Sequence, residues 1–226
     1  MTQALYQNKN IARLYGLFFI ATFLAYGFGY GILDGLLHGD AGNVQFVKPD
    51  LTFILCVIAM VIVHSLLNFG LLTIMFRVIE PFSPLLSLGF LGLGIMSTVA
   101  LLVGGIALML MGSATLETPA IAQMLYDANF YLYQTGMTLW GVGGLLLCAV
   151  LWRTMLVPRI FAIWGMLGYS IFIVGTLSEF FQSGLGVMLS LPGGFFEIGL
   201  SIWLIAKGFN QNPNAPIGHQ AASSMA

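Results

Sequence analysis

A long segment without charge is the feature that most constrains the fold of this chain. No charged residue occurs from Pro81 to Leu116, and Glu80 and Glu117 flank the segment. A helix needs about 20 apolar residues to cross the hydrocarbon core of a bilayer. The whole chain is similarly biased, with 59% hydrophobic and 7% charged residues, against roughly 25% charged residues in soluble domains. A water-soluble fold could not cover its surface with polar groups, so we expect an integral membrane protein.

Six apolar blocks predict an all-α, polytopic bundle of about six transmembrane helices in residues 1–208, followed by a disordered tail, residues 209–226. Helices are expected because backbone groups in lipid must pair within the segment, and no block alternates with period two as a barrel strand does. The second outer loop has room for a separate short interfacial helix at 119–126. The expected spans are 11–33, 51–76, 84–111, 128–151, 158–179 and 185–206.

The basic residues predict the orientation of the bundle, because Lys and Arg concentrate in cytoplasmic loops. All but one of them fall at the same expected end, so both termini are expected in the cytoplasm and the protein in the inner (cytoplasmic) membrane. Lys48 alone lies at the outer end. The remaining set is Lys9, Arg13, Arg77, Arg153, Arg159 and Lys207.

Most acidic residues fall at the outer end, where they would make an acidic mouth. Asp34, His38, Asp40 and Asp50 lie near one another in the first outer loop, but their spacing matches no established metal site, so a solvated loop is expected and no metal is predicted. The net charge of −1 gives no indication of nucleic-acid binding. No zinc-protease, nucleophile-elbow or phosphate-loop motif is present, so neither catalytic residues nor a cofactor is predicted.

Two ionisable residues are expected near the midplane of the membrane, where such groups are costly unless they face the bundle interior or a cavity. Glu197 follows a Pro-Gly-Gly sequence in the sixth span, and His64 is central in the second, with Asn68 on the same helical face. Glu197 is either a neutral carboxyl that satisfies a freed backbone carbonyl or one half of a proton- or cation-linked pair with His64. The candidate ligand- or proton-binding residues are Glu197, His64, Asn68, Gln134 and Tyr169.

A second polar set recurs at helical spacing near the outer ends of the spans. It either lines a water-accessible cavity that opens outward or forms the interfacial aromatic belt and polar caps usual at helix ends. The candidate outer-cavity residues are Tyr26, Tyr30, Asp34, Asp127, Tyr131 and Glu179. Gly27, Gly31 and Gly35 also repeat every four residues there, and this spacing favours close packing against another helix of the same chain.

The stretch from Leu191 to Gly208, LPGGFFEIGLSIWLIAKG, resembles the C-terminal signature of a bacterial membrane family, domain of unknown function 4386. The matching positions are Pro192, Glu197, Trp203, Leu204, Lys207 and Gly208. The chain departs from the family pattern at Gly143, where members often carry histidine. The resemblance implies about six helices and no assigned activity.

The leading functional hypothesis is a small-molecule or cation/proton-linked binding or transport protein with an outward-facing polar cavity. One alternative is a non-catalytic structural or sensory subunit, which predicts a closed, dry bundle that docks a partner. The other is a membrane-embedded lipid-modifying enzyme, which predicts at least two carboxyl groups converging on one open site. The expected partner is the lipid bilayer, with a small-molecule or cation ligand under the leading hypothesis, and the sequence leaves a protein partner or homo-oligomer open.

Overall fold

The computed structural model describes residues 5–38, 48–112 and 118–211, and its regular elements there are all helices. Six helices are long and apolar enough to cross a membrane, which confirms the all-α class and the number of spans. The second span is built from three consecutive pieces: α2, the π-helical turn η2, and α3. The elements are η1 (Leu5–Gln7), α1 (Lys9–Leu37), α2 (Leu51–Ile58), η2 (Ala59–Val63), α3 (His64–Ile79), α4 (Pro84–Leu110), α5 (Pro119–Thr154), α6 (Arg159–Glu179) and α7 (Gly186–Ala206).

Local capping explains where several helices begin. The side chain of Asn8 accepts a hydrogen bond from the backbone N–H of Asn10 at the start of α1, and that of Asp50 accepts one from Phe53 at the start of α2. Pro84 occupies the first turn of α4, where its missing N–H costs nothing. Residues 119–126 do not form a separate interfacial helix, because they are continuous with the rest of α5.

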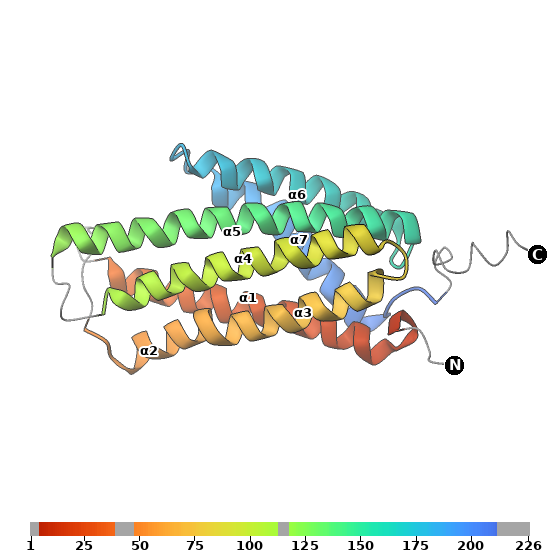
Figure 1. The fold of residues 1–226 in the computed structure, drawn as a ribbon, viewed down its shortest axis with the longest axis horizontal. Coiled ribbons are helices and arrows are strands. Elements are labelled where there is room, and N and C mark those ends of the chain that lie inside the picture. The colour runs from red at the N-terminus through yellow and green to blue at the C-terminus, as the bar shows by residue number, and fades with distance from the viewer. Residues whose placement is uncertain (1–4, 39–47, 113–117, 212–226) are drawn as a thin grey trace, which may run out of the picture.

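The spans form a closed ring in chain order. Each spanning helix packs on the next one along the chain, and α7 closes the ring by packing on α1. Figure 1 shows α5, α4 and the α2–α3 span in front of α1 and α7. Side chains from distant parts of the chain therefore meet inside the ring.

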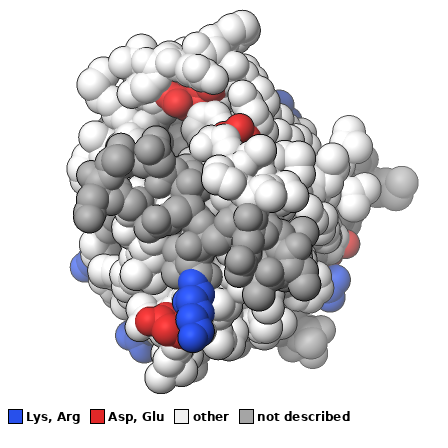
Figure 2. Space-filling model, turned by 90° about the vertical axis from the view of Figure 1, so that its left-hand side faces the viewer, with Lys and Arg blue, Asp and Glu red and all other residues white. Residues whose placement is uncertain are grey.

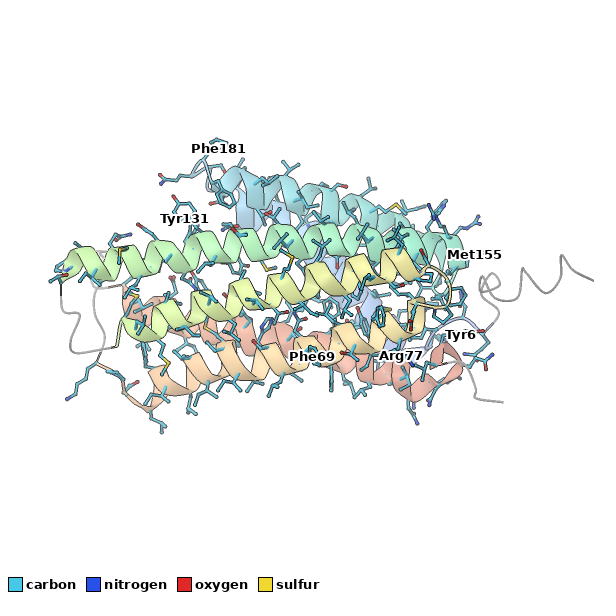
Figure 3. The ribbon with its side chains drawn as sticks, viewed as in Figure 1. Tyr6, Phe69, Arg77, Tyr131, Met155 and Phe181 are labelled. Carbon is cyan, nitrogen blue, oxygen red and sulfur yellow. The ribbon has the colours of Figure 1, made fainter. Side chains whose placement is uncertain are left out.

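Both ends of the described chain lie at one end of the bundle, here called the terminal end; the other is the opposite end (Figure 1). A Cβ atom on Gly208 would lie 3.5 Å from Lys9, which places the end of α7 beside the start of α1. Figure 3 shows Arg77 of α3 at this end as well. Asn210 donates hydrogen bonds to the backbone oxygens of Met155 and Leu156, so the first residues of the expected tail are held against the α5–α6 turn. Residues 212–226 lie outside the described part of the chain.

Two clusters of buried apolar side chains fill the two ends of the ring. The larger occupies the terminal half and includes Tyr15, Met75 and Phe196. The smaller lies toward the opposite end and includes Leu33 and Met111. The outside of the bundle is also apolar, as expected for a surface in contact with lipid: the rings of Phe69 and Phe181 are exposed on it (Figure 3).

Candidate functional site

A cavity of about 200 Å³ lies at mid-length of the helices, and all six spans contribute to its lining. We call it the midplane cavity. It contains the two ionisable residues that the sequence places near the midplane, Glu197 and His64. Six of its described lining residues are aromatic: Phe23, Tyr26, Tyr133, Trp140, Tyr169 and Phe172.

Glu197 is 6% exposed and is oriented by two donors from neighbouring helices. Its Oε1 accepts a hydrogen bond of 2.7 Å from the hydroxyl of Tyr169 on α6 and another of 2.7 Å from the indole N–H of Trp140 on α5. Its Oε2 makes no hydrogen bond to any residue that the structure describes. The partners of the side chain are thus two side-chain donors, and not the freed backbone carbonyl considered from the sequence.

The close packing of α6 and α7 brings Tyr169 and Glu197 together. A Cβ atom on Gly168 would lie 3.0 Å from the backbone of Pro192 and of Gly193, so these helices touch backbone to backbone one turn before Glu197. Gly144 of α5 lies against the ring of Tyr169 and leaves no room for a side chain. Small residues at such contacts let helices in lipid approach closely. The glycines therefore place the Tyr169 hydroxyl at the carboxyl group.

His64 lines the same cavity but has no hydrogen bond or ion pair with Glu197 in the described part of the chain. Its ring is 7% exposed, and its Nδ1 has no hydrogen-bond partner there. The ring packs edge to face on Tyr26, with 5.1 Å between the ring centroids. A second buried polar atom on the cavity, Oγ of Ser97, also has no partner among these residues. Buried polar atoms normally find a partner, so these two atoms beside the cavity are exceptions among the described residues.

The other two midplane candidates differ in position. Asn68 lines the cavity, and its amide donates a 2.7 Å hydrogen bond to Thr98, which donates in turn to the backbone oxygen of Gly94. Gln134 is buried in α5 but is not part of the cavity lining. Its backbone oxygen accepts a hydrogen bond from Thr138.

The structure brings only Tyr26 of the expected outer set to the midplane cavity. Tyr26 and Tyr30 of α1 stack on Tyr133 of α5, with centroid distances of 5.8 and 6.3 Å. These rings lie between the cavity and the opposite end of the bundle. Tyr131 lies on the outside of α5 and packs against Phe180 (Figure 3).

The three outer carboxyl groups of the set bind different partners. Asp34 accepts a hydrogen bond from Tyr126, and Asp127 accepts one from Gln123. Glu179 accepts a 2.7 Å hydrogen bond from the backbone N–H of Gly186, and so stabilises the turn from α6 into α7. The acidic atoms visible on the opposite end lie in separate patches (Figure 2). Within the described ranges no three His, Cys, Asp or Glu residues gather as a metal site would require, and Asp40 and Glu117 lie outside those ranges.

Sequence reasoning missed Trp140, Tyr133 and Ser97 as cavity residues. A signal for the first two was present, because Tyr133, Met137 and Trp140 recur at intervals of four and three residues and therefore share one face of α5. Nothing in the sequence indicated that this face points toward Glu197.

A sequence model of one protein family, described as domain of unknown function (DUF4386), matches residues 14–208. No curated protein and no solved structure matches the chain.

Proposed function

The chain belongs to the domain of unknown function 4386 family, and we propose that it is a proton-linked transporter. Its midplane cavity is the substrate site and binds a small amine cation. The protein is a multi-pass protein of the bacterial inner membrane. The observation that carries the proposal is the buried carboxyl group of Glu197, anchored through Oε1 on a cavity with aromatic walls. The bacterial inner membrane is part of the proposal, supported by the position of the basic residues.

The charge of Glu197 supports a cationic ligand. An ionised carboxylate in hydrocarbon is costly unless it is paired. No Lys or Arg is among the described residues that line the cavity. A proton or a ligand cation would neutralise the carboxylate, and the two would compete for it. This competition is the coupling that a proton-linked transporter needs.

The aromatic walls support an organic cation over a metal ion. A cation over the face of an aromatic ring gains about 0.5–2 kcal/mol, most when the site is desolvated. Tyr26, Tyr133 and Trp140 all line the cavity that holds the carboxyl group. The side chains of Ser97 and His64 also line the cavity, and hydroxyl and neutral imidazole groups can accept hydrogen bonds from an ammonium group.

The two alternatives have less support from the geometry. A lipid-modifying enzyme predicts two carboxyl groups at one open site, whereas the described lining of the midplane cavity contains Glu197 alone. A structural or sensory subunit predicts a closed, dry bundle, and a cavity of about 200 Å³ that is lined by the carboxyl group of Glu197 disfavours it.

The test compares wild type and Glu197→Gln for stabilisation by n-butylamine against heat, with the purified full chain across about pH 5 to 8. Binding requires the ionised carboxyl group, so wild type should be stabilised and its apparent affinity should fall as the pH falls. The variant should show neither effect. Glu80→Gln is the matched control, because Glu80 pairs with Arg77 away from the cavity. Equal responses of wild type and Glu197→Gln would refute the proposal. With binding established, uptake of radiolabelled butylamine into proteoliposomes under a proton gradient tests the transport step.

A further inference from the structure

The helices α1 and α7 both line the midplane cavity, and they are in close contact toward the terminal end. A Cβ atom on Gly16 would lie 2.6 Å from the backbone oxygen of Ser201. Arg13 donates a 3.3 Å hydrogen bond to the backbone oxygen of Ile205, one turn further toward that end. Between the cavity and the terminal end, therefore, α1 and α7 close the ring of helices.

At the level of the cavity the same two helices are separated. Gly27 of α1 and Gly194 of α7 both line the cavity, and a Cβ atom on either would have no heavy atom within 4 Å. Figure 1 shows α7 running obliquely to α1, so that the two ribbons converge toward the terminal end. The glycines thus lie at an opening between the helices.

The opening faces the lipid-exposed side of the bundle. Phe23, Leu191 and Phe195, from the same stretches of α1 and α7, are exposed. At a rise of about 1.5 Å per residue, Gly194 lies about 12 Å along α7 from Gly186, and Gly27 about 15 Å before Leu37. Both positions are within a hydrocarbon core of about 30 Å.

The direct route from the opposite end is filled by side chains. Tyr26, Tyr30 and Tyr133 stack across the space between α1 and α5. Beyond them, the hydroxyl of Tyr126 on α5 donates a hydrogen bond to Asp34 on α1. These rings and this hydrogen bond occupy the space between α1 and α5 on the way to the opposite end.

We propose that the gap between α1 and α7 is a lateral portal through which the ligand enters from the bilayer. The ligand is a lipophilic amine. Its ammonium group binds Glu197, and its apolar tail extends past Gly27 and Gly194 toward lipid. This inference rests on the proposed function, since it assumes that Glu197 binds the ammonium group. The apolar rim suits a hydrocarbon tail and offers nothing to a hydrated ion. The lateral portal differs from the outward-facing polar cavity expected from the sequence, which stays a prediction.

The test uses the full chain in lipid nanodiscs and follows dodecylamine association by stopped-flow tryptophan fluorescence, since Trp140 lines the cavity. The variants are Gly27→Leu, Gly194→Leu and the double variant. At both positions there is room for the added Cβ atom, and the leucine side chains should fill the portal. We expect the double variant to slow dodecylamine association roughly tenfold or more. Gly31→Leu is the matched control, because Gly31 is as open as Gly27 but is not part of the cavity lining. The control should associate as fast as wild type. Dodecanol, which has the tail without the cation, should not compete.

The outcomes separate this inference from the proposed function. If association stays fast in both single variants and in the double variant, while Glu197→Gln abolishes binding, the portal is refuted and the amine site stands. If Glu197→Gln binds dodecylamine and butylamine as wild type does, both proposals fail. Thermal melting of each leucine variant without ligand checks its folding, and the single variants test the portal if the double variant is unstable.

Discussion

The carboxyl group of Glu197 depends on two side chains that lie far from it in the sequence. The hydroxyl of Tyr169 and the indole N–H of Trp140 both donate to Oε1, so this oxygen is satisfied and Oε2 is left for another partner. Hydrogen bonds to a carboxylate are stronger than those between neutral groups. The orientation of the acid is therefore a property of three helices together.

Removal of one donor should destabilise the protein measurably. Tyr169→Phe deletes only the hydroxyl, and because Tyr169 is 2% exposed, the change removes a buried donor to the Glu197 carboxyl group. We expect a loss of about 1–3 kcal/mol in the free energy of unfolding, measured by denaturation in detergent, and weaker amine binding. Tyr131→Phe is the matched control, because that ring lies on the outside of α5. Equal stability of the two variants would show that the Tyr169 hydroxyl contributes nothing.

Among the helices, glycines allow close contacts between neighbours. The spacing of glycines in the sequence, however, does not show which glycines make these contacts. Gly27, Gly31 and Gly35 have the expected spacing of four, yet a Cβ atom on any of them would meet nothing within 4 Å. Their interpretation as packing residues within the chain is wrong. Gly16 and Gly29 of the same helix make the close contacts instead, with Ser201 and Met60.

The contact between α6 and α7 should be sensitive to a single methyl group. Gly168→Ala would place a Cβ atom 3.0 Å from the backbone of Pro192 and Gly193, which cannot move aside as a flexible side chain can. We expect a loss of about 1–3 kcal/mol in stability from this overpacking, seen as a lower melting temperature. Gly92→Ala should be neutral or stabilising, because its Cβ would meet nothing within 4 Å and alanine favours helix. A Gly168→Ala protein that melts with wild type would contradict the backbone contact.

At the scale of the whole molecule, the bundle is asymmetric in charge. The terminal end carries Arg77 (Figure 3), together with Lys9 at the start of α1 and Lys207 after the end of α7. Lys48 lies just before α2, at the opposite end. Because Lys and Arg are retained on the cytoplasmic side, we predict that the terminal end faces the cytoplasm.

Labelling of single cysteines in intact cells tests this orientation. Both natural cysteines, Cys56 and Cys148, are free and buried, so the background should be low. A membrane-impermeant maleimide added outside should label Phe181→Cys, which replaces a side chain that is 88% exposed at the turn from α6 to α7. Gln211→Cys should react only after the cells are opened. The reverse pattern would overturn the predicted orientation.

Hydropathy and charge alone predicted the all-α membrane class, the six spans and the place of Glu197 and His64 near the middle of theirs. A segment that crosses a bilayer must be apolar and must pair its own backbone groups, and this requirement applies to each segment separately. Hydropathy and charge therefore identify the spans one by one. Which polar residues share a cavity could not be predicted in this way, because it depends on how the helices pack. The rotation and tilt of each helix are set by packing between distant segments, such as Gly168 on Pro192 and Gly144 on Tyr169. That packing turned Trp140 toward Glu197, left Gln134 outside the cavity lining, and separated α1 from α7 at Gly27 and Gly194.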